Sequence, residues 1–345
     1  MKRALQRAWL SRGWLAYLLW PLSQLYRLLV SWRRRLYQSG FFKSEQAGVP
    51  VLVVGNVVAG GAGKTPLVIA LVKHLRLRGI EVGVVSRGYG RTGETCREVF
   101  ADTSALTSGD EPALLRRTTD APVFIAKRRI DAARALLIAH PQTQLLVCDD
   151  GLQHYGLARD VEVAVFDDRG LGNGWLMPAG PLRESWPERL HNGVHLVLHT
   201  GQSPAFDGFT SFRQLADYAV DSAGNRVPLD SLKGQAVVAL AAIAHPDAFF
   251  SMLMANGLAL SHTISLPDHY DFSHYQLSDS KGRTVLCTEK DAVKLFELPS
   301  MAGIRLLAVP LLFAPEPAFL DALDALLEPL LSPVLLSQLP SHYGH

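Results

Sequence analysis

Apolar runs alternate with amphipathic stretches through the middle of the chain. The run "VPVLVVG" at residues 49–55 is apolar almost throughout, as expected of a strand buried on both faces of a sheet. The next stretch places Leu67, Leu71 and Leu75 at helical spacing. This alternation predicts an α/β fold with a doubly wound, mostly parallel sheet. Strands are expected within residues 49–55, 81–90, 121–126, 143–150 and 161–167, and helices at residues 64–78, 110–117 and 129–139.

The pattern changes after residue 204. Residues 204–234 are polar and rich in turn residues, which predicts a short β-ribbon, and residues 235–258 and 283–296 then each repeat a strand followed by a helix. We therefore expect a second, smaller α/β domain. The predicted segments are an N-terminal helical segment (1–45), a P-loop core (46–205), a β-ribbon linker (206–232), the smaller domain (233–330) and a tail (331–345).

The N-terminal segment predicts an amphipathic helix. Apolar residues recur at helical spacing from Trp14 to Leu36, while Ser23, Arg27 and Arg34 share another face. The longest run without charge covers residues 13–26, which is shorter than the roughly 20 apolar residues of a membrane-spanning helix. The helix could therefore lie in a membrane surface, or it could pack its apolar side against the protein itself.

Charge favours the membrane surface. Residues 1–50 contain nine Lys or Arg and one acidic residue, a net charge of +8, so the rest of the chain carries −6 of the total of +2. Basic residues mixed with Trp, Tyr and Leu are typical of an interfacial helix, and they argue against nucleic acid as the partner. The cysteines are Cys96, Cys148 and Cys287, which form neither a metal pattern nor a disulfide framework and indicate a reducing compartment.

The stretch "GNVVAGGAGKTP" at residues 55–66 joins the first expected strand to the first expected helix. Its glycines let backbone amides approach phosphate oxygens, Lys64 can reach the β- and γ-phosphates, and the Thr65 hydroxyl can ligate Mg²⁺. Val58 replaces the first glycine of the commonest P-loop pattern. The predicted nucleotide-binding residues are Val58, Ala59, Gly60, Gly61, Ala62, Gly63, Lys64 and Thr65.

Further charged residues follow expected strands. Asp149 and Asp150 in "LLVCDDGLQH" stand at a strand end, where carboxylates can hold the magnesium ion of a nucleotide. "SRGYG" ends the strand expected within residues 81–90. Asp110 of "GDEP" begins a helix, which keeps a carboxylate ionised for proton acceptance. The loop "GNGWLMPAGPLRES" at residues 172–185 is longer than a simple connection requires.

A nucleotide switch or a metallocentre-loading GTPase or ATPase is the alternative to a kinase. A GTPase of this class should carry an [NT]-K-x-D element that reads guanine. The nearest string is "TEKD" at residues 288–291, whose lysine is misplaced. This observation disfavours the switch.

In their order along the chain, the P-loop, "SRGYG", "GDEP", "DDGLQH", "GNGWLMPAGPLRE" and "TEKDAVK" resemble the tetraacyldisaccharide 4′-kinase (LpxK) family from about residue 14 to residue 325. The resemblance implies ATP and Mg²⁺ as cofactors. It implies transfer of the γ-phosphate to the 4′-hydroxyl of a tetraacyldisaccharide 1-phosphate lipid, giving lipid IVA in lipid A (lipopolysaccharide) biosynthesis. It also implies a peripheral enzyme at the cytoplasmic face of the bacterial inner membrane. We expect no nucleic acid and no stable protein partner.

The resemblance also assigns roles to residues. Asp110 and His269 would form the dyad that deprotonates the sugar hydroxyl, with Lys64 as a further catalytic residue, and His274 is an alternative to His269. Thr65, Asp149 and Asp150 would serve the metal. The disaccharide contacts would fall on Arg87, Tyr89, Gln153, His154, Arg183 and Glu184.

Overall fold

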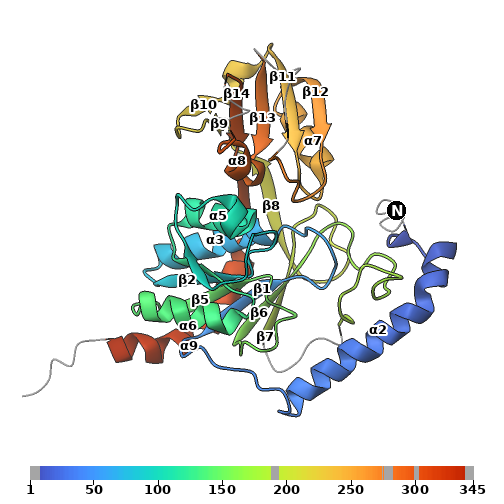
Figure 1. The fold of residues 1–345 in the computed structure, drawn as a ribbon, viewed down its shortest axis with the longest axis vertical. Helices are drawn as coiled ribbons and strands as arrows, with labels where there is room; N and C mark the ends of the chain where they lie inside the picture. The colour runs from blue at the N-terminus through green and yellow to red at the C-terminus, as the bar shows by residue number, and fades with distance from the viewer. Residues whose placement is uncertain (1–7, 188–193, 274, 276–282, 299–302, 339–345) are drawn as a thin grey trace, which may run out of the picture.

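The chain forms two α/β domains, one above the other in Figure 1, with a long N-terminal helix beside the larger one. The computed structural model describes residues 8–187, 194–273, 275, 283–298 and 303–338. The predicted fold class is confirmed: a mostly parallel sheet carries the P-loop, an amphipathic helix precedes it, and a smaller α/β domain follows.

The larger domain is built on a nine-stranded sheet in the order β15-β8-β7-β6-β1-β5-β2-β4-β3. Neighbouring strands are parallel except at the two edges, where β15 and β3 run antiparallel. Its strands are β1 (Val51–Gly55), β2 (Val82–Ser86), β3 (Arg97–Val99), β4 (Val123–Ile125), β5 (Leu145–Asp149), β6 (Val161–Phe166), β7 (Val194–His199), β8 (Phe209–Leu215) and β15 (Leu311–Pro315).

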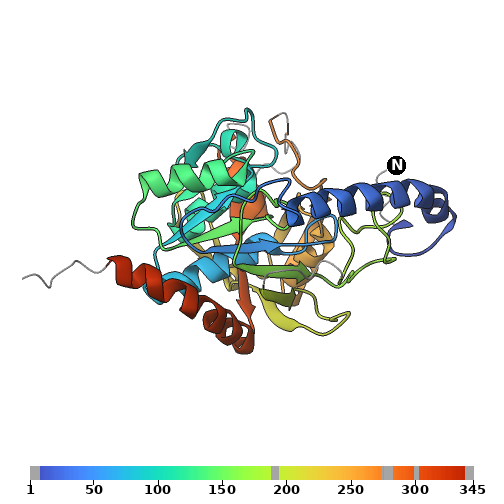
Figure 2. The ribbon, with the colours of Figure 1, turned by 90° about the horizontal axis from the view of Figure 1, so that it is seen from below.

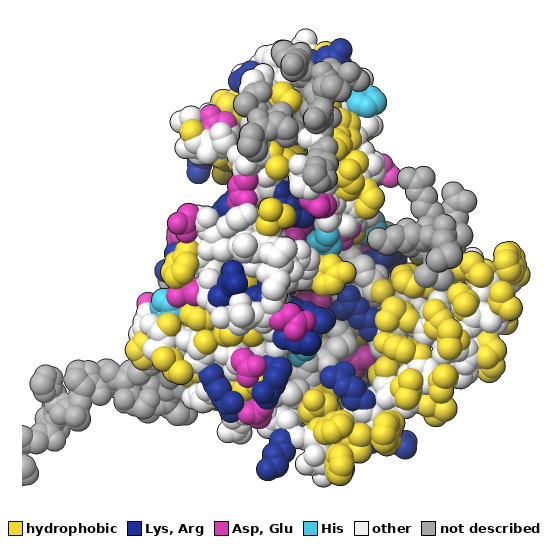
Figure 3. Space-filling model, viewed as in Figure 1, with side chains coloured by type: hydrophobic (Ala, Val, Ile, Leu, Met, Phe, Trp, Pro, Cys, Tyr) yellow, Lys and Arg dark blue, Asp and Glu magenta, His cyan; other side chains and the backbone are white. Residues whose placement is uncertain are grey.

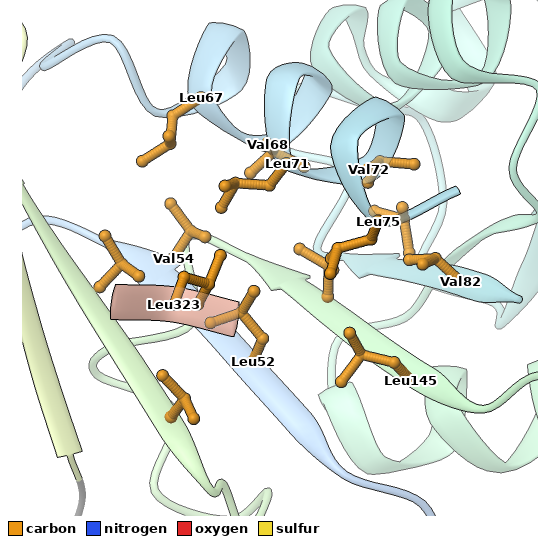
Figure 4. Close-up of a cluster of buried hydrophobic side chains, with 14 of the residues drawn as sticks. Leu52, Val54, Leu67, Val68, Leu71, Val72, Leu75, Val82, Leu145 and Leu323 are labelled. Carbon is orange, nitrogen blue, oxygen red and sulfur yellow. The ribbon is translucent and has the colours of Figure 1, made fainter. Parts of the chain in front are cut away.

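Helices cover both faces of this sheet (Figure 2). Because side chains alternate along a strand, Leu52 and Val54 of β1 face one helical layer while Val51 and Val53 face the other. Figure 4 shows side chains of α3 pointing toward β1, with Leu323 of α9 on the same face. The helices of this domain are α3 (Lys64–Leu77), α4 (Ala105–Ser108), α5 (Asp110–Thr119), α6 (Arg129–Ala139) and α9 (Pro317–Gln338).

The N-terminal helix α2 (Trp14–Gln38) buries its small and polar side and exposes its apolar side. Ala16 and Ser23 are its buried residues, whereas Trp14 is 78% exposed and Leu18 is 67% exposed. Hence the alternative, in which the apolar side packs against the protein itself, is wrong. Figure 3 shows the resulting apolar stripe along the helix. Its exposed large residues are Trp14, Tyr17, Leu18, Trp20, Leu22, Leu25, Leu28, Leu29 and Trp32.

The smaller domain is built on a six-stranded sheet in the order β10-β9-β14-β13-β11-β12. Strands β12, β11, β13 and β14 are parallel, and β9 and β10 add an antiparallel edge. Its strands are β9 (Tyr218–Val220), β10 (Arg226–Pro228), β11 (Ala236–Ala241), β12 (Ala259–Ser265), β13 (Thr284–Thr288) and β14 (Arg305–Val309), and its helices are α7 (Pro246–Ala255), α8 (Glu289–Leu295) and the 3₁₀ helix η1 (Leu229–Leu232).

The domain boundaries differ from the expected ones. Residues 206–232 do not form a separate ribbon, because β8 joins the large sheet while β9 and β10 join the small one. The chain also returns to the larger domain before residue 330: β15 pairs with β8, and Phe319 of α9 is buried in the larger core. The expected tail from residue 331 is helical as far as Gln338. The apolar face of α9 explains this return, since it covers the large sheet.

Candidate active site

A cavity of about 1370 Å³ lies between the two domains and collects most of the predicted site residues. The P-loop and the strand ends of the large sheet line it from one side, and His269 and Lys290 line it from the other. The predicted residues that line it are Gly60, Gly61, Ala62, Gly63, Lys64, Thr65, Arg87, Tyr89, Asp149, Asp150, Gln153, His154, Arg183 and His269.

Val58 and Ala59 do not line this cavity, although both belong to the predicted nucleotide loop. Val58 is buried and forms an antiparallel bridge with Leu182, and the Ala59 N–H donates to the Pro181 carbonyl over 2.8 Å. The loop is therefore still extended at this point and pairs with the segment "PAGPLRE". This explains why a valine can replace the first glycine, because no tight turn is made there.

The turn predicted to bind phosphate begins at Gly60. Gly60 has φ +102° and Gly63 has φ +77°, conformations that glycine adopts without strain. Gly63 precedes α3, so Lys64 and Thr65 stand at the helix N-terminus beside the cavity. Amide N–H groups and the helix dipole together favour an anion here.

Lys64 contacts two residues in the cavity. Its Nζ lies 3.1 Å from Asn56 Oδ1 and 3.4 Å from Asp150 Oδ1. Arg183 Nη1 also lies 3.3 Å from the same Asp150 oxygen. Burial alone would raise the pKa of Asp150, but Lys64 and Arg183 lower it, so Asp150 is a carboxylate held between two cations.

Asp149 has a different environment from its neighbour. It is buried, and its Oδ1 atom has no hydrogen-bond partner among the described residues. Ser86 Oγ lies 3.4 Å from its Oδ2 atom. Burial, followed by the charges of Glu111 and Asp150, raises the pKa of Asp149. A buried carboxylate oxygen without a partner, next to a phosphate loop, fits a hard cation such as Mg²⁺.

Protein side chains alone do not complete a metal site here. No group of three or more His, Cys, Asp or Glu side chains within the described ranges could hold a metal ion. The donors expected from the sequence are the Thr65 hydroxyl and the carboxylates of Asp149 and Asp150, which leaves other coordination positions for phosphate oxygens and water. Such an incomplete protein site is typical of Mg²⁺ that is bound together with a nucleotide.

Asp110 and His269 form a pair across the domain boundary. Asp110 begins α5 of the larger domain, His269 follows β12 of the smaller one, and Asp110 Oδ2 lies 3.0 Å from His269 Nδ1. His269 has φ +61°, a strained value for a residue with a Cβ. Asp110 does not itself line the cavity, so the imidazole lies between the carboxylate and the open space. His274 lies outside the described residues.

Electrostatics favour an ionised Asp110. Burial would raise the pKa of Asp110, but the hydrogen bond from His269 and the charges of Lys290 and Lys294 hold it well below its ordinary value. Burial would likewise lower the pKa of His269, yet the hydrogen bond to Asp110 leaves that pKa raised. The pair is therefore a carboxylate that orients an imidazole of increased basicity.

Two lysines of the "TEKDAVK" motif surround this pair. Lys294 Nζ lies 2.9 Å from Asp110 Oδ2, and Lys290 Nζ lies 3.4 Å from His269 Nε2. Lys290 also contacts Glu111 and Asp268. The sequence pattern assigns no role to these lysines, because "TEKD" suggests only a guanine reader with a misplaced lysine. In the structure Lys290 neutralises acidic side chains beside the proposed dyad.

The predicted disaccharide contacts other than Glu184 line a second wall of the cavity. The Gln153 side chain donates to the Asn56 carbonyl over 3.1 Å and faces Arg183 Nη1 over 3.3 Å. Burial and the charges of Arg129 and Arg87 lower the pKa of His154 to about 3, so its imidazole is neutral at pH 7. Glu184 does not line the cavity; it is buried and accepts a hydrogen bond from the Tyr155 hydroxyl.

Arg87 and Tyr89 extend from the loop that follows β2. Both residues are exposed and line the cavity, and the Tyr89 ring lies 5.3 Å from the His269 ring. Arg129 is not among the predicted site residues. It begins α6, is buried beside the cavity, and approaches the carbonyls of Asp149 and Asp150 over 3.5 and 3.4 Å. Arg129 is the last residue of the run "KRR" and the first of the helix, a pattern that carries no specific signal.

Helix α2 is joined directly to these loops. Ser23 Oγ donates to the Leu176 carbonyl over 2.8 Å, and the Tyr26 hydroxyl donates to the Arg183 carbonyl over 3.1 Å. Farther along the helix, Arg33 Nη1 lies 3.3 Å from the Gln153 carbonyl oxygen. The exposed apolar stripe therefore stands next to the proposed acceptor wall.

Comparisons with known proteins show which family the chain belongs to. The sequence profile of the tetraacyldisaccharide-1-P 4′-kinase family matches residues 15–328. The chain is 64% identical over 345 residues to the tetraacyldisaccharide 4′-kinase of Polaromonas naphthalenivorans, covering 100% of this chain and 99% of that one. It is 54% identical to the enzyme of Acidovorax ebreus over 95% of each chain.

A solved structure agrees with these relatives. The chain superposes on the "apo" form LpxK from Aquifex aeolicus, crystallised in complex with ATP, with a TM-score of 0.78 and 29% identity. The match covers 92% of this chain and 99% of that one. These comparisons give no support to the nucleotide-switch alternative, and by sequence and fold the chain belongs to the tetraacyldisaccharide 4′-kinase family.

Proposed function

We propose that this chain transfers the γ-phosphate of ATP to the 4′-hydroxyl of a tetraacyldisaccharide 1-phosphate lipid, forming lipid IVA in lipid A biosynthesis. One observation supports the proposal most directly. A phosphate-binding loop and a carboxylate–imidazole pair from different domains meet at a single cavity. A kinase needs both, because it must hold the phosphoryl donor and orient the acceptor hydroxyl.

Different residues of the cavity serve different parts of the reaction. The acceptor oxygen attacks the γ-phosphorus, the bond from that phosphorus to the ADP oxygen breaks, and the hydroxyl proton passes to His269. Nε2 is the acceptor atom, because Nδ1 faces Asp110. Lys64 and the amides of the P-loop neutralise the charge on the transferred group. Bound Mg²⁺ would supply further neutralisation of the phosphate oxygens.

The proposal is tested by incubating the purified protein with ATP, Mg²⁺ and tetraacyldisaccharide 1-phosphate in mixed micelles. We expect one phosphate to be added per lipid, detected by mass spectrometry, with an equal amount of ADP. The same lipid already phosphorylated at the 4′-position is the control and should give no product. ADP formation without phosphorylated lipid, or preferential binding of guanine nucleotides, would contradict the proposal.

We also propose that Asp149 ligates Mg²⁺ directly while Asp150 orients Lys64 and Arg183. Replacing Asp149 with Asn should therefore raise the Mg²⁺ concentration for half-maximal activity by about 10- to 100-fold. Asp150→Asn is the matched control and should affect the metal requirement less. Binding of Mn²⁺ to the ATP complex, followed by electron paramagnetic resonance, gives a second measurement. A larger metal effect in Asp150→Asn would reverse the assignment.

We further propose that α2 lies in the cytoplasmic surface of the inner membrane. Among the described residues, no helix is long and apolar enough to cross a bilayer, so the argument rests on the stripe itself. Leu and Trp side chains can enter the acyl boundary, while basic residues such as Arg35 meet anionic headgroups. The acceptor is a lipid, so its sugar headgroup would reach the cavity from the same surface.

The membrane proposal predicts the behaviour of a triple variant, Leu18→Glu/Leu25→Glu/Leu29→Glu. Its partitioning onto anionic vesicles should fall at least about 10-fold, because each buried leucine contributes roughly 1.5–3 kcal/mol. Sedimentation with vesicles measures this. A control with the same added charge replaces the exposed Leu77, Leu106 and Ile138, which lie away from α2. Equal loss of binding in both variants would contradict a role of the stripe.

A further inference from the structure

Arg169 lies outside the set of predicted site residues, yet it holds the backbone of the P-loop. It follows β6 and extends its guanidinium group to the loop, where Nη1 donates to the Ala59 carbonyl and Nη2 donates to the Gly61 carbonyl, each over 3.1 Å. Both bonds come from one planar group. The two alternate carbonyls are therefore fixed together rather than independently.

Fixing these two carbonyls also fixes the orientation of the N–H group in the same peptide unit. The C=O and N–H of one peptide unit point in opposite directions, because the unit is planar and trans. Holding the Ala59 and Gly61 carbonyls against Arg169 therefore directs the N–H groups of Gly60 and Ala62 away from it. Gly60 and Ala62 both line the cavity. Arg169 would thus direct two donors toward the place where phosphate is expected.

The orientation of Arg169 depends on Asp167. Arg169 Nε lies 3.0 and 2.9 Å from the two oxygens of this carboxylate. Burial would raise the pKa of Asp167, but hydrogen bonds from His245 and Arg169 hold it below its ordinary value, so the group stays ionised. An ionised, largely buried carboxylate restricts the rotamers of the arginine that it binds.

The smaller domain contacts this carboxylate. His245, which precedes α7, places Nε2 3.3 Å from Asp167 Oδ2. The neighbouring residue Ala244 touches the P-loop itself: its Cβ lies 2.8 Å from where a Cβ on Gly61 would stand. Gly61 is thus required for the contact between domains as well as for phosphate approach. The smaller domain therefore reaches the loop directly through Ala244 and indirectly through His245 and Asp167.

We propose that Arg169 is a positioning residue for ATP binding, and that His245 couples the placement of the smaller domain to the P-loop through Asp167 and Arg169. This inference rests on the proposed ATP site but not on the identity of the acceptor. The smaller domain also carries His269. The same domain placement that brings His269 to Asp110 would then set the amides that receive the phosphates.

ATP binding tests the proposal without turnover. The dissociation constant of ATP is measured by calorimetry for Arg169→Ala, Arg169→Lys, His245→Ala and the double variant Arg169→Ala/His245→Ala. Loss of the two charge-assisted bonds should raise the constant by about 10- to 100-fold in Arg169→Ala. Arg169→Lys should not restore affinity, since an ammonium cannot bind both carbonyls in a fixed fork. The KM for the lipid should stay unchanged.

Coupling predicts that the two changes are not additive. His245→Ala should raise the dissociation constant several-fold when Arg169 is present and have almost no effect in Arg169→Ala. His262→Ala and Arg305→Ala, which replace exposed residues of the smaller domain, are matched controls and should bind ATP normally.

Two results would overturn the proposal: normal ATP affinity in Arg169→Ala, or equal effects of His245→Ala with and without Arg169. If Arg169→Ala does not fold, Arg169→Lys supplies the same comparison. If the parent protein does not phosphorylate the lipid, the proposed identity of the acceptor is wrong. The dissociation constants of ATP still test the roles of Arg169 and His245.

Discussion

Replacing Lys64 with Ala should lower kcat by about 10²- to 10³-fold, the cost of removing one preorganised charge from a phosphoryl-transfer site. Lys64 stands at the N-terminus of α3 beside the cavity and contacts Asp150 at 3.4 Å. Its loss removes the cation that faces the developing charge. Steady-state kinetics with saturating ATP and lipid measure the effect.

The matched control for this change is Lys127→Ala. Lys127 is exposed and pairs with Glu94 at the surface, so its removal should leave kcat within about twofold of the parent value. Circular dichroism and thermal unfolding establish that Lys64→Ala remains folded. Near-normal turnover of a folded Lys64→Ala protein would refute the P-loop kinase proposal.

Asp110→Asn should reduce kcat by about 10²- to 10⁴-fold and shift the pH dependence of the residual activity. A protonated His269 cannot accept the hydroxyl proton, so activity falls as the pH drops through the pKa of His269. In the parent protein this pKa is raised from its ordinary value of 6.5 by Asp110. The acid limb of the kcat profile therefore lies above 6.5.

Without the carboxylate, burial and the charge of Lys290 lower the pKa of His269. The acid limb of Asp110→Asn should accordingly move to lower pH. Asp120→Asn, at the opposite end of α5 and exposed, is the control for the loss of one negative charge on this helix. An unshifted limb, or a change confined to the KM for ATP, would show that Asp110 does not act through His269.

Much of the site follows from local sequence. Parallel strands with both faces buried read as continuous apolar runs, and the residues after them meet at one edge of the sheet. That rule alone predicts that Lys64, Asp149 and Arg87 lie around one cavity, as they do. The stripe of α2 is also visible in its spacing, although the spacing does not decide whether the stripe faces solvent or the core.

The remaining features depend on contacts that are distant in sequence. Arg169 reaches the P-loop across about a hundred residues, and Arg129 and Lys290 gain their roles only because separate elements pack together. The boundary of the smaller domain escapes prediction for a related reason. The apolar face of α9 fits either sheet, and only tertiary packing selects the larger one.

The pairing of Leu215 with Leu311 has a consequence for how the enzyme is assembled. The chain leaves the larger domain after the first of these residues and re-enters it beside the second. In topological terms the smaller domain is an insertion between two neighbouring antiparallel strands, β8 and β15. The parent fold would hold the phosphoryl donor and the insert would receive the proton. The covalent connection between the two halves of the chemistry therefore runs only through these two neighbouring strands.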